Sequence, residues 1–496
     1  MPESFTIAVD RDGLVIYFAV NGRRFLFNGN NGAFYDSLPD YAVEILEILR
    51  KQKDHWASAF AAAYMKHGRS GIGLLEEIRQ YRNGTHAGLT PEKRRDQFSE
   101  EPMPSAFNVY MAQACNLRCR YCFNQQGTFG QTPLFMSEQT ARSLLALITR
   151  SVRSGRHRVI GVNLFGGEPL LAPRAVYVLA RGLQDLNHQD LPARVHLMLS
   201  TNGTIYSKEI FDIIAERPDL SAVIVSLDGF KNTHDRNRPF ANPRLGSGYD
   251  AVLHNLRRMM REKIPYSVTC VVPYPHDYIG AAEALHRLGV RRLEIKELIR
   301  HVYGRTSLAG LFRRDFPLWK KRYLAYTDYY IDYLPSRNPV PHSNRFNMIG
   351  DYARALGKPA ADRRTLACGL ASEKVGVTSD GRLIPCESFL GHDAFEIGNV
   401  ERGLDSSKFE RFEEWIFSRG QHRIEHKRCR TCYTKLICGG GCYALSYDRT
   451  RRLHPLPEAS CKYVRETTKI DLYYISRMRK EHPGIYAKIT GAPAPD

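Results

Sequence analysis

Three cysteines lie within eight residues of each other, in the segment ACNLRCRYCF at positions 114–123. Their spacing is Cys115-x3-Cys119-x2-Cys122, and an apolar, strand-like segment comes directly before them. A short loop after a strand could direct all three sulfurs to one point. Four thiolates saturate a zinc ion or a four-iron cluster, whereas three leave one position open for another ligand. The spacing therefore predicts a metal centre with one open position.

A second group of cysteines lies in the C-terminal part of the chain. It contains Cys368, Cys386, Cys429, Cys432, Cys438, Cys442 and Cys461. In a reducing compartment, eleven clustered cysteines indicate metal ligands or catalytic groups more than disulfides. A zinc ribbon is the alternative for the Cys429-x2-Cys432 pair, but ribbons use two such dyads and only one is present. Cys270 lies in an apolar segment and is predicted to be a small buried residue.

Glycines and polar residues follow three further strand-like segments. They form the stretches Gly166-Gly167-Glu168-Pro169, Ser200-Thr201-Asn202-Gly203 and Ser226-Leu227-Asp228-Gly229. Ligands of α/β sheets and barrels collect at the carboxyl ends of the strands. Two glycines allow a close approach of the backbone to a ligand, and Glu168 offers an acceptor for a cationic ammonium. Each stretch alone could also be a simple turn.

The elements that position these residues alternate between strand and helix from about 105 to 300. Six strand-like segments begin near positions 106, 159, 194, 222, 265 and 291, and each of the first five is followed by room for a crossover helix. Mostly apolar strands separated in this way favour a parallel sheet covered by helices. Six units are fewer than the eight of a closed barrel. The predicted fold class is therefore α/β, with a partial (β/α)6 TIM-like barrel.

A smaller module precedes this region. Residues 1–82 contain three strand-like segments, with Asn21-Gly22 as a hairpin turn between the last two, and then three helical patterns. Residues 83–104 are a polar, charged linker. Residues 301–366 match no motif and could shape a substrate cleft, while their tyrosines at 323–333 predict a packed helix. Residues 466–496 are predicted as a C-terminal tail.

Composition excludes some classes of protein. The chain has 71 Lys and Arg against 52 Asp and Glu, a formal net charge of +19, which attracts anions in general. Nucleic acid is not expected as a partner, because no compact basic tract or aromatic-basic interleave is present. The N-terminus has no signal-peptide pattern and no run of 18 apolar residues occurs, so a soluble cytoplasmic protein without a membrane partner is predicted.

The segment around Cys115 resembles the CxxxCxxC signature of the radical S-adenosylmethionine (SAM) enzymes at every position. The resemblance implies that Cys115, Cys119 and Cys122 hold a [4Fe-4S] cluster whose unique iron is chelated by the amino and carboxylate groups of SAM. The GGEP stretch would orient the SAM amino group, and Arg238, in HDRNRP, would contact the carboxylate. The full set of implied SAM contacts is Tyr121, Gly166, Gly167, Glu168, Ser200, Asn202, Ser226, Asp228 and Arg238.

The C-terminal cysteines resemble the SPASM domain of peptide-modifying radical SAM enzymes, over residues 367–465. This resemblance implies two auxiliary [4Fe-4S] clusters, three in all. One would be held by Cys429, Cys432, Cys438 and Cys461, and the other, nearer the active site, by Cys368, Cys386 and Cys442, with one iron open to water, a side chain or a substrate thiolate. Glu387 stands where sulfatase-maturing relatives carry a general base, although an exposed loop glutamate is the alternative. His422 and His426 are predicted to lie on a solvated helix face rather than to bind metal.

Residues 1–82 look like the winged-helix recognition element of enzymes that modify ribosomally synthesised peptides (RiPPs), although an ordinary capping or DNA-binding winged helix is the alternative. There a leader peptide adds as a strand to a sheet edge. The resemblance implies a maturase of a precursor peptide. A 5'-deoxyadenosyl radical would abstract hydrogen from the core peptide. A cysteine thiol would then capture the carbon radical as a thioether and pass an electron to the clusters. An external electron donor such as flavodoxin or ferredoxin would reduce the clusters.

Several alternatives stay open at this point. Carbon–carbon crosslinking by the same machinery is the nearest, and a sulfatase-type formylglycine maturase follows. An RNA-modifying radical SAM enzyme and a zinc-binding regulator are more distant. The sequence does not identify the peptide substrate, the bond formed, the fourth ligand of the cluster at Cys368 or the oligomeric state.

Overall fold

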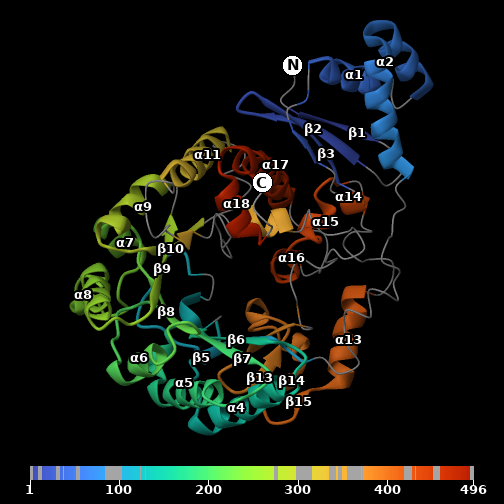
Figure 1. Ribbon diagram of the computed structural model, residues 1–496. Helices are drawn as coiled ribbons and strands as arrows, with labels where there is room; N and C mark the ends of the chain where they lie inside the picture. The colour runs from blue at the N-terminus through green and yellow to red at the C-terminus, as the bar shows by residue number, and fades with distance from the viewer. Residues whose placement is uncertain are drawn as a thin grey trace. The chain divides into compact units, whose positions relative to one another are not determined.

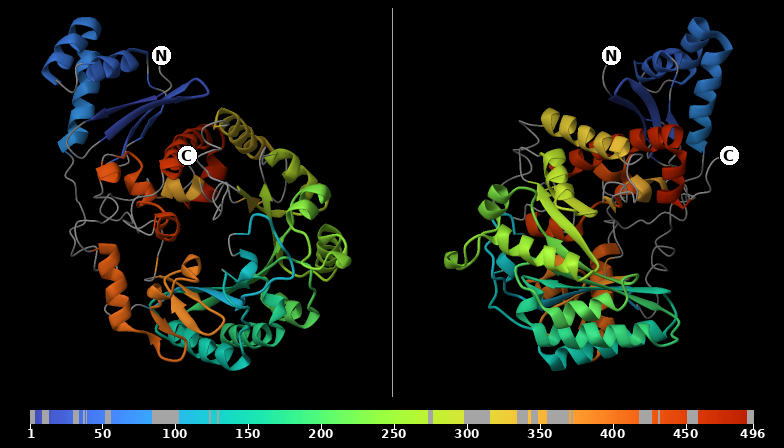
Figure 2. Two further views of the ribbon diagram at one scale, coloured as in Figure 1. Left: turned by 180° about the vertical axis from the view of Figure 1, so that it is seen from behind. Right: turned by 60° about the vertical axis from the view of Figure 1, so that its left-hand side comes forward.

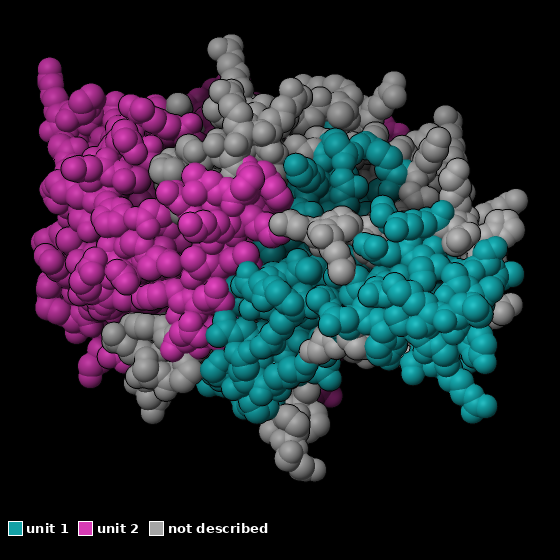
Figure 3. Space-filling view, turned by 90° about the horizontal axis from the view of Figure 1, so that it is seen from above, with its two compact units in different colours: residues 1–96, 346–368, 416–496 teal, residues 97–345, 369–415 magenta. Residues whose placement is uncertain are grey.

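Figure 1 shows the computed structural model of the protein. The chain forms two compact units, which Figure 3 shows in different colours: unit 1 comprises residues 1–96, 346–368 and 416–496, and unit 2 comprises residues 97–345 and 369–415. The structure describes residues 4–8, 14–29, 34–36, 38, 40–51, 56–83, 103–122, 125–128, 130–272, 277–297, 316–333, 342–343, 349–354, 370, 373–417, 427–430, 432–450 and 458–491.

Unit 2 is built on a sheet whose six central strands are all parallel. They are β5 (Ala106–Ala112), β6 (Val159–Gly166), β7 (Arg194–Thr201), β8 (Ser221–Ser226), β9 (Tyr266–Val272) and β10 (Arg292–Glu297). They pair in chain order, so that each strand lies beside the one before it. The predicted six-strand parallel sheet is confirmed.

Helices connect these strands and cover the outer face of the sheet (Figure 1). They are α4 (Glu138–Arg153), α5 (Pro173–Asn187), α6 (Lys208–Ala215), α7 (Lys231–Asn237), α8 (Gly248–Arg261) and α9 (Tyr278–Arg287). Burial alternates along β6, where Ile160, Val162 and Leu164 are fully buried and Gly161, Asn163 and Phe165 are only partly buried. The apolar set lies on one face of the pleat and the partly polar set on the other.

Five short strands extend the same sheet on both sides. They are β11 (His342–Ser343), β12 (Lys374–Val377), β13 (Arg382–Ile384), β14 (Gly398–Asn399) and β15 (Gly403–Leu404). Strand β12 pairs in parallel with β5, and β13 to β15 continue as an antiparallel meander. Ser379 Oγ donates to the carbonyl of Tyr110 at 2.8 Å and anchors the β12–β13 turn on β5. The chain from residue 373 onward therefore begins as part of the same sheet as β5 to β10.

Two further helices of the C-terminal half of the sequence are α11 (Phe316–Tyr333) and α13 (Ser406–Phe417). In α11, Tyr323, Tyr326 and Tyr330 are at most 3% exposed, which confirms the prediction of a packed helix for this tyrosine-rich stretch. The remainder of residues 301–366 is largely outside the described residues.

The N-terminal part of unit 1 is an antiparallel sheet followed by helices (Figure 2). Its elements are β1 (Ser4–Ala8), β2 (Leu14–Val20), β3 (Arg23–Asn28), β4 (Phe34–Asp36), α1 (Asp40–Lys51) and α2 (Trp56–Asn83). The Asn21-Gly22 turn is present, with positive φ at both residues, as a type I′ hairpin requires. Strand β4 was not predicted. The last two predicted helical patterns are both found within α2, one on each side of Gly68, where the backbone leaves the helical conformation.

The C-terminal part of unit 1 is helical. It contains α14 (Lys427–Arg430), α15 (Lys435–Cys438), α16 (Tyr443–Thr450), α17 (Glu458–Glu481) and α18 (Pro483–Thr490). Residues 466–496, predicted as a tail, therefore contain most of α17 and all of α18. Along the described parts of the chain, no helix is long and apolar enough to span a membrane.

Helix α17 packs on the N-terminal sheet. The rings of Phe25 and Tyr473 meet edge to face at 6.1 Å, and Arg23 forms an ion pair with Glu481 at 2.6 Å. Val15, Tyr17 and Leu26 belong to a separate buried cluster that includes residues of α1 and α2. Neighbouring residues of a strand point to opposite faces of the sheet. Phe25 packs against α17, whereas Leu26 packs with residues of α1 and α2, so both faces of the sheet are covered.

Candidate functional site

The cysteine loop follows β5 at the carboxyl end of the parallel sheet. Its backbone is held by residues 237–241: the Arg118 N–H donates to the carbonyl of Pro239 and the Arg120 N–H to the carbonyl of Asn237, both at 2.8 Å. An antiparallel bridge joins Leu117 to Phe240. The loop is therefore fixed by a segment more than one hundred residues away along the chain.

Hydrogen-bond donors point at the sulfur of Cys115. The Leu117 N–H donates to Sγ at 3.4 Å and Asn202 Nδ2 at 3.7 Å. Burial raises the pKa of Cys115 to about 12 and that of Cys119 to about 11, and the Arg238 guanidinium opposes the shift at Cys119. Metal binding would have to displace these protons, because thiolates rather than thiols are ligands.

The three sulfurs do not converge on a single-ion site. Within the described ranges, no group of three or more His, Cys, Asp or Glu side chains is arranged to hold one metal ion. A four-iron cluster binds each thiolate at a different iron, so its ligands stand farther apart than those of one zinc ion.

Gly166 and Gly167 bring the end of β6 against the cysteine loop. A Cβ added at Gly166 would lie 2.4 Å from the carbonyl oxygen of Ala112, and one at Gly167 would lie 2.0 Å from that of Ala114. The N–H groups of Gly167 and Glu168 donate to these same two carbonyls at 2.8 Å. The close approach predicted for these glycines is therefore an approach to the backbone that precedes Cys115.

Glu168 is fully buried and accepts hydrogen bonds at both carboxylate oxygens. Thr201 Oγ1 donates at 2.8 Å, the Asn202 N–H at 2.7 Å and the Leu170 N–H at 3.1 Å. Burial raises the pKa of Glu168 to about 7, and the three donors counteract part of that shift. The described residues give Glu168 no cationic partner, so the carboxylate lacks the counter-charge that would stabilise its ionised form.

Tyr121 of the cysteine loop contacts the buried pair Asp228 and Arg238. The Tyr121 hydroxyl donates to Asp228 Oδ2 at 2.6 Å, Arg238 Nε reaches the same oxygen at 3.2 Å, and the guanidinium lies 5.2 Å from the Tyr121 ring centre. The Val271 N–H donates to the other carboxylate oxygen at 3.1 Å. Arg238 and Asp228 therefore contact each other as well as forming part of the predicted SAM-binding set.

A ladder of polar side chains crosses the partly buried face of the sheet. Ser200 Oγ lies 2.8 Å from Asn163 Oδ1, Asn163 Nδ2 lies 3.5 Å from Asn108 Oδ1, and Asn108 Nδ2 donates to Glu387 Oε2 at 2.9 Å. Lys374 Nζ forms an ion pair with the Glu387 carboxylate at 2.9 Å. Glu387 is thus connected through side chains to the end of β7.

The remaining predicted SAM contacts lie on neighbouring strand ends. Ser226 is partly buried at the end of β8 and pairs across strands with Thr269. Asn202 donates to Asn116 Oδ1 at 2.7 Å and accepts from the Thr204 N–H at 2.9 Å. Asn202 therefore braces the cysteine loop.

Four of the C-terminal cysteines lie in the helical part of unit 1. Cys429, Cys432, Cys438 and Cys461 are all partly exposed. The Cys432 N–H donates to the carbonyl of Cys429 at 2.9 Å, which forms the tight turn of the C-x2-C motif. Burial raises the pKa of Cys461, and the negative charges of Glu458 and Cys432 raise it further, while Arg428 and Arg465 lower it. Both arginines form ion pairs with Glu458.

The ligand set predicted for the nearer auxiliary cluster stays a prediction. Cys368 lies outside the described residues, as do His422 and His426. Cys386 is buried and belongs to unit 2, and Cys442 is exposed and belongs to unit 1. Cys270 is 1% exposed within β9, which confirms its prediction as a buried small residue.

Several residues of this site were not predicted from the sequence. Asn108 and Asn163 stand opposite each other in the register of β5 and β6, and both interrupt apolar runs, which is a signal that could have been used. Thr201 lies within the quoted STNG stretch. The sequence around Lys374 does not predict its contact with Glu387, because that contact depends on the pairing of β12 with β5.

Comparison with known proteins gives this geometry a family. Residues 109–292 match the family model described as the Radical SAM superfamily. The chain contains a radical SAM domain. That domain covers the six parallel strands from within β5 to the start of β10.

Individual relatives extend beyond the radical SAM domain. The chain is 24% identical over 366 residues to the serine-type anaerobic sulfatase-maturating enzyme of Klebsiella pneumoniae, over 70% of this chain and 84% of that enzyme. It shares its fold with native anSMEcpe with bound AdoMet and Cp18Cys peptide, at a TM-score of 0.58 and 20% identity over 76% of this chain and 99% of that one. Streptococcus suis SuiB gives a TM-score of 0.52 at 17% identity, over 91% of this chain and 98% of SuiB.

The radical SAM family implies SAM and a [4Fe-4S] cluster, and the residues present suit both. Cys115 receives N–H donors at its sulfur, as a cluster thiolate does. Glu168 is a buried carboxylate for which the described residues supply no cation, so it suits a ligand that carries an amino group. Among described residues, these two observations favour the predicted site over a structural turn.

Proposed function

We propose that this radical SAM protein modifies a ribosomally synthesised precursor peptide by crosslinking a cysteine thiol to a carbon atom of another residue as a thioether. The observation that carries the proposal is the continuous polar ladder from the strand end at Ser200 to Glu387. It places a carboxylate on the same face of the sheet as a residue of the predicted SAM site. The peptide carried by the related anSMEcpe structure supports a substrate of the same class.

The predicted cofactors would occupy the carboxyl end of the sheet. Cys115, Cys119 and Cys122 would hold the [4Fe-4S] cluster, and Glu168 would accept an N–H of the SAM amino group with the lone pairs that Thr201, Asn202 and Leu170 leave unused. When bound, the cluster supplies one electron to SAM, and cleavage of SAM provides the oxidant that removes a hydrogen atom from the peptide.

Glu387 would accept the proton of the substrate thiol. Its carboxylate is held by Asn108 and Lys374, and the Tyr110 hydroxyl donates to its backbone carbonyl at 2.9 Å. A general base must be held within hydrogen-bond reach of the proton it takes, and three contacts fix this one. In Glu387→Gln we expect SAM cleavage to continue while crosslinked product is lost, because thiol deprotonation is separate from SAM cleavage.

The auxiliary clusters and the N-terminal sheet complete the proposal. Two [4Fe-4S] clusters would be held by the C-terminal cysteines, and the electron released when the thiolate bonds to the substrate carbon would pass to them. An external electron donor would reduce the protein. The leader of the precursor would add as a strand to an outer strand of the N-terminal sheet, which is β1 or β4 in the observed order. Backbone hydrogen bonds would supply affinity, and the partly buried Tyr35 of β4 would contribute to register.

The test is co-expression with a small cysteine-containing peptide encoded beside this gene. We expect the peptide to lose two mass units per crosslink and one cysteine to become resistant to alkylation. An unmodified peptide, under reduced conditions in which SAM is cleaved, would contradict the proposal.

A second function is favoured by the sulfatase-maturating relatives. A formylglycine maturase would convert a cysteine or serine of a sulfatase peptide into an aldehyde, with Glu387 again as the base. Labelling with a hydrazide distinguishes the two products, because a thioether does not react and an aldehyde does. Carbon–carbon crosslinking would also remove two mass units but would leave every cysteine open to alkylation.

A further inference from the structure

Exposed arginines surround the cysteine loop of unit 2. Arg118 and Arg120 flank Cys119 on either side, and both side chains are exposed. Arg236 and Arg244 are exposed on the segment that holds the loop in place. We call these four side chains the loop arginines.

Backbone contacts bring the loop arginines together. The N–H of Arg120 donates to the carbonyl of Asn237, the neighbour of Arg236, at 2.8 Å. The N–H of Ala241 donates to the carbonyl of Asn116 at 2.8 Å, and Arg244 follows three residues later. The arginines therefore lie on two chain segments that run side by side.

The positive charge of this surface is not neutralised locally. In the described part of the chain, no carboxylate forms an ion pair with any of the loop arginines, whereas the nearby Lys231 pairs with Asp250. Arg118 is used partly by the protein itself, since its Nη1 donates to the carbonyls of Cys115 and Leu117 at 2.9 and 3.1 Å. The net charge of +19 adds to the same field.

We propose that the loop arginines are the docking surface for the protein that delivers electrons to the cluster at Cys115, Cys119 and Cys122, a small acidic redox protein of the flavodoxin or ferredoxin class. This inference rests on the proposed function. One electron leaves the reduced donor and enters the cluster, so the donor must come close to the loop itself. Charge complementarity speeds encounter and selects orientation, which is what a transient redox complex requires.

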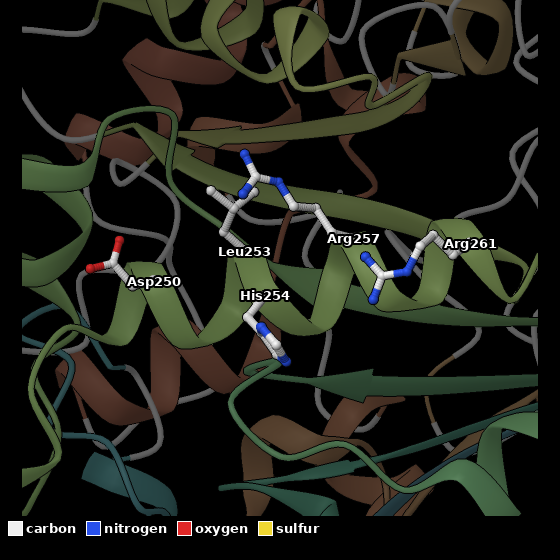
Figure 4. A pocket seen from close by; sticks show the side chains of 5 residues that line it. All are labelled: Asp250, Leu253, His254, Arg257 and Arg261. Carbon is white, nitrogen blue, oxygen red and sulfur yellow. The ribbon is translucent and has the colours of Figure 1, made fainter.

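A second basic surface provides a matched control. Figure 4 shows a pocket of about 310 Å³ on α8 that is lined by Asp250, Leu253, His254, Arg257 and Arg261. Arg257 and Arg261 are exposed and lie on one helix, which carries none of the predicted site residues. Arg261 is the last residue of α8 and therefore lies about 20 Å along the helix from the first residue, Gly248.

The experiment compares two double variants of the full-length, cluster-loaded enzyme. Arg236→Glu with Arg244→Glu changes the docking surface, and Arg257→Glu with Arg261→Glu makes the same change of charge on α8. Arg118 and Arg120 are left intact because they lie in the cysteine loop. Binding of oxidised flavodoxin is measured by fluorescence anisotropy at low and high salt, so that the readout does not depend on turnover.

We expect the first variant to bind flavodoxin about tenfold more weakly at low salt, with the difference shrinking at high salt, and the second to bind as the wild type does. SAM cleavage driven by dithionite should be unchanged in both. Equal binding by both variants, or equal loss in both, would overturn the docking surface. The docking surface would also be overturned if the first variant lost binding to RNA while its binding to flavodoxin stayed unchanged. Failure of dithionite-driven SAM cleavage in the wild type would instead refute the proposed function.

Discussion

Glu168 is the residue whose surroundings say most about its role. A carboxylate with three hydrogen-bond donors is well satisfied, yet complete burial without a cation still raises its pKa to about 7. Its position directly after two glycines that press on the cysteine loop leaves little freedom for rearrangement. A ligand that brings positive charge or N–H donors would stabilise the ionised form of this carboxylate.

The raised pKa of Glu168 predicts a pH dependence of stability in the SAM-free protein. From about pH 4.5 to 7 Glu168 has lost its proton in the unfolded chain but keeps it in the folded chain. The free energy of unfolding therefore falls as pH rises, by about 3 kcal/mol in total, and levels off above pH 7. Glu168→Gln should remove this slope. Denaturant unfolding at pH 5 and pH 8 measures it, with the exposed Glu209→Gln as control. A slope that persists in Glu168→Gln would contradict the assignment.

Removing one charge of the buried pair Asp228 and Arg238 should strongly lower the stability of the protein. Both side chains are at most 8% exposed, so Asp228→Asn leaves a buried guanidinium without its carboxylate. We expect the free energy of unfolding to fall by about 3–5 kcal/mol. Urea denaturation measures this loss, and the double variant Asp228→Asn with Arg238→Gln should recover part of it. Wild-type stability of the single variant would show that the pair is not a buried ion pair in solution.

At the level of elements, the strength of the sequence pattern decided what could be predicted. The six parallel strands are six to eight residues long, and all six predicted strands are found. Strands β11 to β15 have two to four residues each, too short for periodicity, and they were missed. The position of Glu387 depends on the pairing of β12 with β5, so its contacts with Asn108 and Lys374 could not be predicted.

The contact between the ends of β5 and β6 predicts a sharp difference between two glycines of the same segment. Gly167→Ala would place a Cβ 2.0 Å from the Ala114 carbonyl oxygen, whereas a Cβ at Gly161 finds only the Ser105 carbonyl oxygen at 3.8 Å. We expect Gly167→Ala to lose most of the iron bound at the cysteine loop and Gly161→Ala to keep it. Iron analysis after removal of the auxiliary cysteines by substitution reports on this loop alone. Equal iron in both variants would refute the contact.

A similar contact joins β3 to the C-x2-C segment within unit 1. A Cβ at Gly29 would lie 2.4 Å from the Cα and the carbonyl oxygen of Tyr433, and the Tyr433 hydroxyl donates to the carbonyl of Arg465 in α17 at 3.0 Å. Gly29→Ala should therefore lower the thermal stability of the protein by several degrees. Gly73→Ala, at a position with open space around it, is the control and should not lower it. Unchanged melting in Gly29→Ala would argue against this packing.

At the scale of the whole molecule, the two ends of the sequence share one unit. The sheet of residues 4–36 and helix α17 bury Phe25 against Tyr473, so the N-terminal region is not an independent module in its packing. Sequence patterns could suggest its strands and helices but not this partner, because the contact joins segments more than four hundred residues apart. Deleting residues 1–82 would expose α17, and substitutions at the outer strands are therefore the better test of leader binding.

We expect the loop at Cys115, Cys119 and Cys122 to hold an iron–sulfur cluster that cleaves SAM. The direct measurement is 5'-deoxyadenosine formation by the anaerobically purified, reduced protein, together with its iron and acid-labile sulfide content. The wild type should contain both elements and form 5'-deoxyadenosine, while a variant with all three cysteines changed to alanine should form none and keep only the auxiliary iron. A colourless zinc protein without iron or sulfide, or equal 5'-deoxyadenosine formation by the variant, would contradict the account.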